Sequence, residues 1–158
     1  MMVSEFLHES TVRVGLEARN KTAAIEELVD VLVEEHEISV ASRADIIQIV
    51  LDREKMMSTG MEQGVAIPHG ATDVVDDVIA AFGVSHEGID FHSVDGRLAH
   101  IVILLILPVN EYSAGVKTMS GITKILTHEG LRKRIVDAST ASEVIDVLIE
   151  EEERRHLA

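Results

Sequence analysis

The stretch Gly-Val-Ala-Ile-Pro-His-Gly at 64–70 holds the side chain of this 158-residue sequence that is best placed to do chemistry. Pro68 restricts Ile67 to extended backbone geometry, and Gly70 allows a turn that a Cβ atom would hinder. We therefore expect His69 to be held rigidly at the end of a short strand. An imidazole fixed in this way can act as a nucleophile, a general base or a metal ligand, whereas a lone histidine in a turn can equally be a capping or core residue.

The segments before this stretch have the sequence patterns of a strand and two helices, which would position it. Apolar residues alternate with polar or small ones over 12–16, which is typical of a short strand with one buried face. Asn20 is a good N-cap for a helix that runs through Glu35, because apolar residues follow at helical spacing. A second helix is predicted from Ser42 to about residue 53, with the hydroxyl of Ser42 capping it through a Ser-x-x-Asp pattern.

The remaining segments continue the alternation. The helical pattern fails over 54–64, which predicts a loop leading into a short strand at 65–67. The apolar runs 78–84 and 100–107 have the length and β-branched content of strands buried on both faces. Two further helices are predicted, one over 116–126 and one that begins near residue 140. Interleaved strands and helices indicate the α/β class, with a central sheet covered by helices in a single domain, 1–158.

The charge and composition exclude several functional classes. The chain has 14 basic and 28 acidic side chains, a net charge of −14, which argues against nucleic acid as a partner and suits a basic protein. Its 46% hydrophobic content argues against disorder. There is no cysteine, no basic flank with a long apolar run at the N-terminus, and no apolar stretch near the roughly 20 residues that cross a bilayer. We expect a cytoplasmic protein without direct membrane insertion.

Two other groups of residues invite a chemical interpretation. His86, His92 and His100 could approach one another and suggest a zinc site, but they lack a regular ligand spacing. We expect them to be scattered histidines, and we expect neither a metal nor a cofactor. Three methionines, Met56, Met57 and Met61, are expected to pack flexibly around the site or to form an apolar rim on which a carrier protein docks.

At family level, the sequence resembles the IIA components of the fructose/mannitol class in the bacterial phosphoenolpyruvate-dependent sugar phosphotransferase system. The resemblance rests on Arg-Glu at 53–54, Ser-Thr-Gly at 58–60 and the 64–70 stretch. It extends to the first helix, to a mid-chain turn at 87–96 and to the strand that Pro108 ends, and so covers essentially the whole chain. It implies the IIA fold, a central mixed β-sheet covered by helices on both faces.

The resemblance also implies a function. The family's histidine at the position of His69 takes a phosphoryl group from the phosphocarrier protein HPr and passes it to a IIB domain. Arg53 matches the family's active-site arginine, whose planar guanidinium suits phosphate oxygens, although it can also be a solvated residue at a helix end. Ser58 and Thr59 could donate hydrogen bonds to a phosphoryl group, but the same sequence is common in plain turns.

Two positions depart from the family pattern. Gly115 stands where members typically carry a second histidine, at the start of the helix after Pro108, and its loss should slow transfer. The N-terminus of that helix would still favour an anion. Gln63 replaces an acidic residue found in some members.

Three functions are therefore compared. The first is a phosphoryl carrier between HPr and a IIB domain, a phosphotransferase component that does not turn over alone. The second is a regulatory protein in which phosphorylation of His69 controls binding to a protein target, because a phosphoryl group adds roughly −1.5 to −2 charges. The third is a scaffold that keeps the fold without phosphorylation.

Overall fold

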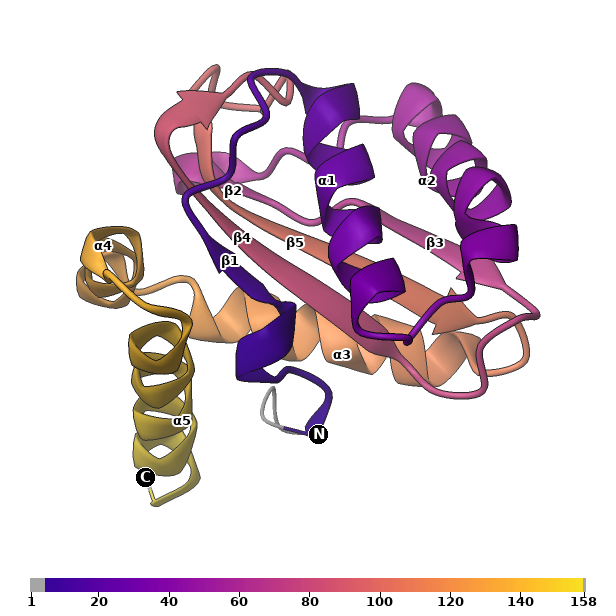
Figure 1. Cartoon of the computed structure of the whole chain (residues 1–158). Coiled ribbons are helices and arrows are strands. Elements are labelled where there is room, and N and C mark those ends of the chain that lie inside the picture. The colour runs from indigo at the N-terminus through magenta and orange to yellow at the C-terminus, as the bar shows by residue number, and fades with distance from the viewer. Residues whose placement is uncertain (1–4, 158) are drawn as a thin grey trace.

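The computed structural model describes residues 5–157, which form a layered arrangement of strands and helices (Figure 1). The strands are β1 (Val12–Val14), β2 (Val65–Ala66), β3 (His69–Thr72), β4 (Ile79–Ile89) and β5 (Ala99–Pro108). The helices are α1 (Lys21–Glu34), α2 (Arg43–Met56), α3 (Tyr112–Ile125), α4 (Glu129–Asp137) and α5 (Ala141–Leu157). The sheet has the order β1-β4-β5-β2, and β3 also pairs with β5. It is mixed, because β4 and β5 are antiparallel while the other pairings are parallel.

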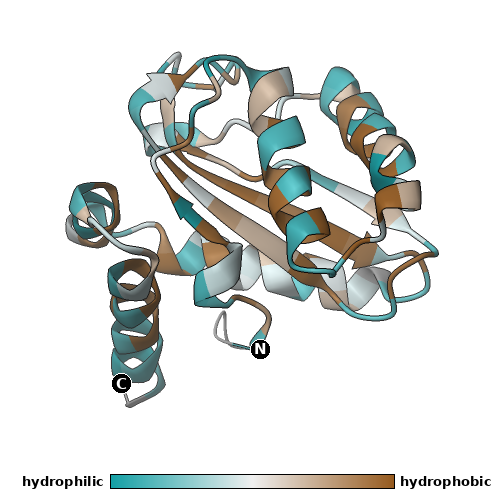
Figure 2. Ribbon diagram, in the orientation of Figure 1, coloured by the Kyte–Doolittle hydropathy of each residue, from teal (hydrophilic) through white to brown (hydrophobic). Residues whose placement is uncertain are grey.

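Strand β5 lies at the centre of the molecule and is buried on both faces, as its apolar sequence predicts. Its side chains alternate between two cores, because successive residues of a strand point to opposite faces. Ile103 and Leu105 pack in the core formed with α3, α4 and α5, whereas Leu104 and Ile106 pack in the core formed with α1 and α2. Figure 2 shows the apolar colouring along the strands and on the helix faces turned toward them. The predicted α/β class, with helices on both faces of a mixed sheet, is confirmed.

The structure corrects several predicted boundaries. Helix α2 continues to Met56, and Ser42 does not cap it through its side chain. Residues 40–42 form a 3-10 turn that runs directly into α2, so Ser42 has helical backbone angles and its hydroxyl accepts a hydrogen bond from Ser39 instead. Residues 87–89, predicted as part of a turn, extend β4. Sequence patterns missed α4, because only Leu131 and Ile135 are buried in it.

The predicted N-cap of α1 is confirmed, and it gives a stability prediction. The side-chain oxygen of Asn20 accepts a hydrogen bond from the backbone N–H of Ala23 at 2.8 Å. We expect Asn20→Ala to lower the free energy of unfolding by about 1 kcal/mol, because one N–H group at the helix start loses its partner. Urea denaturation measures the change, and Asn20→Asp, which keeps an acceptor, is the matched control. Equal stability of Asn20→Ala and wild type would contradict the assignment.

None of the helices within residues 5–157 is long and apolar enough to cross a lipid bilayer.

Candidate functional site

His69 begins β3, and the chain is paired with β5 both before and after Pro68. Ala66 of β2 pairs with Val102 of β5, and His69 pairs with Leu105, so the parallel register is the same before and after Pro68. The carbonyl of Pro68 also accepts the backbone N–H of Leu105 at 3.0 Å. The short interruption at 67–68 therefore leaves the chain paired with β5 without a shift, and the backbone of His69 is fixed beside the central strand.

The imidazole of His69 has a defined orientation. Its Nδ1 atom lies 3.0 Å from the carbonyl oxygen of Ile67. A carbonyl oxygen can only accept, so this geometry assigns the proton of the neutral ring to Nδ1 and leaves the lone pair on Nε2. The side chain is half-buried, and Nε2 is the ring nitrogen available to react.

A pocket of about 350 Å³ opens beside His69. It lies between α2, β3, the end of β5 and α3, and its wall includes the guanidinium-bearing side chain of Arg53. The other lining residues are Ile49, Gly70, Ala71, Leu107, Pro108, Val109, Val116 and Met119. The structure thus brings the two principal predicted site residues together in one pocket that is otherwise mostly apolar, which strengthens electrostatic interactions inside it.

Arg53 lies in the last turn of α2. Its Nη1 atom donates a hydrogen bond to the carbonyl oxygen of Met57 at 3.0 Å, just beyond the end of the helix. This bond uses one of the five N–H groups of a guanidinium. The arrangement places a permanent positive charge on the pocket that His69 also lines.

Gly70 serves the site by close packing. It belongs to β3 and has no positive φ, so the predicted turn is wrong. A Cβ atom at this position would lie 2.8 Å from Cγ2 of Ile49 and 3.2 Å from Cγ2 of Val50, both on α2. Glycine is needed because β3 approaches α2 too closely for a side chain, and this approach brings His69 to the pocket that Arg53 also lines.

Ser58 and Thr59 do not line the pocket. The hydroxyl of Ser58 donates to the carbonyl oxygen of Phe91, and the hydroxyl of Thr59 donates to Oε2 of Glu54 at 2.6 Å. Both hydroxyls therefore hold the loop after α2 in place. Direct donation to a phosphoryl group, the predicted role, would require them to leave these partners.

Gln63 is also placed away from the pocket. Its backbone has a positive φ of 67°, and its N–H donates to Oδ2 of Asp95 at 2.8 Å. The backbone N–H groups of Gln63 and Arg97 lower the pKa of the Asp95 carboxyl group, because they stabilise its charged form.

Gly115 lies in the first turn of α3, and its neighbour Val116 lines the pocket. A Cβ atom on Gly115 would come within 2.8 Å of Cδ1 of Leu107, which also lines the pocket. The side chain of Leu107 therefore occupies the space that a larger residue at 115 would enter.

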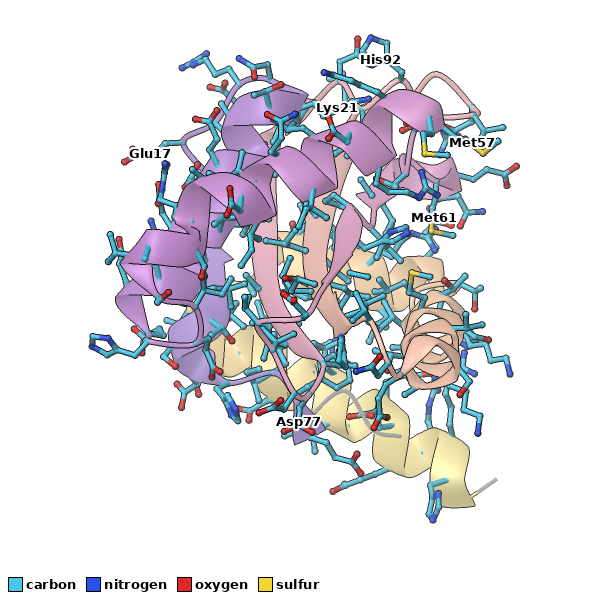
Figure 3. All side chains as sticks on the ribbon, turned by 90° about the vertical axis from the view of Figure 1, so that its right-hand side faces the viewer. Glu17, Lys21, Met57, Met61, Asp77 and His92 are labelled. Carbon is cyan, nitrogen blue, oxygen red and sulfur yellow. The ribbon has the colours of Figure 1, made fainter. Side chains whose placement is uncertain are left out.

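Three methionines, Met56, Met57 and Met61, and the histidines His86, His92 and His100 do not line the pocket. Met56 and Met57 are 82% and 71% exposed, and Met61 is partly buried against the core. Figure 3 shows Met57 and Met61 on one side of the molecule, near the end of α2. Within residues 5–157, no three His, Cys, Asp or Glu side chains gather in a way that could hold a metal ion. His100 instead places Nδ1 2.9 Å from the carbonyl oxygen of Ser85.

The apolar wall of the pocket and the buried carboxylate of Glu54 were not predicted from the sequence. Leu107, Val109, Val116 and Met119 read as ordinary strand, turn and helix residues, and no local pattern distinguishes them. For Glu54, one sequence feature could have indicated a role at the site: it directly follows Arg53 in the Arg-Glu pair at 53–54.

Comparison with known proteins identifies the family. The model of the family "Phosphoenolpyruvate-dependent sugar phosphotransferase system, EIIA 2" matches residues 5–151. The chain is 30% identical to the fructose-specific EIIABC component of Bacillus subtilis, over 94% of this chain and 23% of that protein. It is 32% identical to the fructose-specific EIIA component of Haloferax volcanii, over 82% of this chain and 83% of that protein.

Two solved structures share the fold. The nitrogen regulatory protein IIA-Ntr of Neisseria meningitidis superposes with a TM-score of 0.84 at 29% identity, covering 92% of this chain and 98% of that one. The mannitol enzyme IIA of Escherichia coli, solved in complex with phosphorylated enzyme IIB, superposes with a TM-score of 0.77 at 25% identity, covering 91% and 97%. The site, the fold and the match over nearly all of the sequence lead to one conclusion: the chain belongs to the EIIA 2 family of the phosphoenolpyruvate-dependent sugar phosphotransferase system.

Proposed function

We propose that residues 1–158 act as one phosphoryl-carrier domain, which accepts a phosphoryl group from phospho-HPr on Nε2 of His69 and passes it to a IIB domain. The observation that carries the proposal is the orientation of His69, with Nδ1 on the carbonyl of Ile67 and the ring in a pocket shared with Arg53. The relatives' fructose-specific and IIA names support the same activity. Exchange with HPr would take place in the cytoplasm.

The chemistry needs few groups. The lone pair of Nε2 attacks phosphorus, the bond from phosphorus to the donor atom breaks, and the leaving electron pair stays with the donor. As the N–P bond forms, the imidazole becomes positively charged, and the Nδ1–H bond to the Ile67 carbonyl stabilises that charge. Arg53 offsets the negative charge of the transferring oxygens. Phosphoryl transfer depends mainly on such positioning and charge stabilisation.

Met56 and Met57 supply the surface on which a carrier would dock. They are exposed, apolar and next to the loop that holds Arg53. Methionine adapts to different partner surfaces, and a net charge of −14 would speed the approach of a partner with a basic face.

A regulatory role is the second candidate, because the matched structure from Neisseria is a nitrogen regulatory protein. Phosphorylation would add about −1.5 to −2 charges to an already acidic surface and so change its affinity for a protein target. The two candidates separate in one experiment. Protein phosphorylated with phosphoenolpyruvate, enzyme I and HPr is mixed with a IIB domain, and transfer to the IIB cysteine supports the transport relay. Stable phospho-protein that does not transfer supports regulation.

The position of Gly115 gives a rate prediction. We expect Gly115→His to accelerate phosphoryl acceptance only when Leu107→Ala is present in the same chain, because Leu107 fills the space that the new side chain needs. Stopped-flow measurement with phospho-HPr compares the single and double variants.

Gly130→His is the matched control, since Gly130 is also a helical glycine and a Cβ atom there meets nothing within 4 Å. Equal rates for the double variant and for Leu107→Ala alone would show that the missing histidine does not limit transfer.

A further inference from the structure

Glu54 is a buried acidic residue next to Arg53 in the sequence, with only 6% of its surface exposed. Successive residues of a helix point in different directions, so Glu54 enters the protein interior while Arg53 lines the pocket. A buried carboxylate is rare unless it is paired and hydrogen-bonded, because burial without partners is very unfavourable. Its partners therefore indicate what it does.

Three donors reach the carboxylate of Glu54. The backbone N–H of Thr59 donates to Oε1 at 2.9 Å, and the hydroxyl of Thr59 donates to Oε2 at 2.6 Å. The ammonium group of Lys21, in the first turn of α1, lies 3.1 Å from Oε1. Lys21 is held in turn over the ring of Phe91, with Nζ 5.7 Å from its centre. Figure 3 shows Lys21 and Met57 toward the same end of the molecule. The ion pair of Lys21 with Glu54 joins the start of α1 to the last turns of α2.

Thr59 passes this constraint to His69. Its carbonyl oxygen accepts the backbone N–H of Ile67 at 3.1 Å. The carbonyl oxygen of Ile67 is in turn the partner of Nδ1 of His69 at 3.0 Å. Hydrogen bonds joined through the backbones of Thr59 and Ile67 therefore link the Glu54 carboxylate to the imidazole, and each bond fixes the position of the group that makes the next one.

The same loop also orients Arg53. Its first residue, Met57, accepts the hydrogen bond from Nη1 of Arg53 through its carbonyl oxygen. Glu54 precedes Met57 in the chain and binds Thr59, which follows it. The carboxylate therefore fixes the loop 57–59, which contains the Met57 carbonyl group that accepts from Arg53. The buried carboxylate of Glu54 thus contacts the loop that orients both the guanidinium of Arg53 and the imidazole of His69.

We propose that Glu54, paired with Lys21, is a positioning residue that selects the Nδ1–H tautomer of His69 and the direction of Arg53 through the loop 57–59. It acts on the site without touching the transferred group. The effect on rate rests on the proposed carrier function, whereas the effect on the tautomer does not.

The test measures both effects in Glu54→Gln, which keeps the side-chain shape and removes the charge. Long-range ¹H–¹⁵N NMR of the full chain at a pH where the ring is neutral reports the tautomer of His69. We expect unprotonated Nε2 in wild type and a mixture of tautomers in Glu54→Gln. We expect phosphoryl acceptance from phospho-HPr to fall about tenfold, as for loss of one charge-assisted hydrogen bond. Thr59→Val removes only the hydrogen bond of the hydroxyl group. It should change the tautomer of His69 and the acceptance rate in the same direction as Glu54→Gln, but to a smaller extent.

Glu62→Gln is the matched control, because Glu62 is exposed in the neighbouring turn, and it should leave tautomer and rate unchanged. A folded Glu54→Gln with wild-type tautomer and rate would overturn the proposal and leave Glu54 a purely structural role. If Glu54→Gln does not fold, Thr59→Val decides in the same way. A mixed tautomer in a protein whose wild type accepts no phosphoryl group would support positioning by Glu54 and reject the carrier function.

Discussion

Replacing His69 with alanine is expected to abolish phosphoryl acceptance while the protein remains folded. The substitution removes the only imidazole among the described residues that line the pocket beside Arg53, and with it the nucleophile that takes the phosphoryl group. The fold should persist, because His69 is half-buried and its Nδ1 bond is local, to the carbonyl oxygen of Ile67 two residues earlier. Intact-protein mass spectrometry at neutral to alkaline pH, after incubation with phosphoenolpyruvate, enzyme I and HPr, detects one acid-labile phosphoryl group in wild type and none in His69→Ala.

His100→Ala is the matched control for this experiment. The ring of His100 makes the same kind of Nδ1 contact with a backbone carbonyl, that of Ser85, but His100 does not line the pocket. This variant should gain the phosphoryl group as wild type does. Labelling of His69→Ala to the wild-type extent would remove the assignment of His69, and loss of labelling in His100→Ala would redirect it.

Arg53→Ala is expected to slow phosphoryl acceptance by about 10²- to 10³-fold, the range found when one group that stabilises transition-state charge is removed. Arg53 is the residue of the pocket wall that carries a permanent positive charge, and its pocket is otherwise mostly apolar. Arg53→Lys should fall between wild type and alanine, because lysine keeps the charge but not the planar pair of donors. Rapid-quench or stopped-flow kinetics with phospho-HPr measures the three rates.

Lys55→Ala provides the control, since Lys55 lies on the same helix turn, is 76% exposed and makes a long ion pair with Asp52 at 4.0 Å. Such surface pairs contribute little. A rate for Arg53→Ala within twofold of the Lys55→Ala rate would show that the charge of Arg53 does not act on the transferring group.

Local sequence patterns were sufficient to predict those helices and strands whose caps and apolar spacing lie within a few residues of one another. The N-cap of α1 was predicted from Asn20 and the apolar spacing after it, and the side chain indeed caps the helix. The burial of β5 on both faces followed from its unbroken apolar run. The boundaries were less well predicted: α2 is longer than expected, and α4 carries too few apolar residues to show a periodic pattern.

For the candidate site, too, the sequence predicted some residues correctly and others not. Pro68 and the resemblance to a known family singled out His69 and Arg53, and the structure places both on one pocket. Ser58 and Thr59, which the same motif suggested, hold the loop after α2 instead.

The sequence by itself determined the chemistry available to this protein: one imidazole in a rigid extended segment, one arginine at a helix end, no thiol, and strands and helices in alternation. Only the tertiary structure decided how these groups act. The close approach of β3 to α2 at Gly70, the space beside Gly115 filled by Leu107, and the link from Glu54 to His69 all depend on contacts between separate elements. The physical reason is that periodicity and capping report each segment's own backbone, whereas hydrogen-bond partners and packing distances are set when distant segments meet.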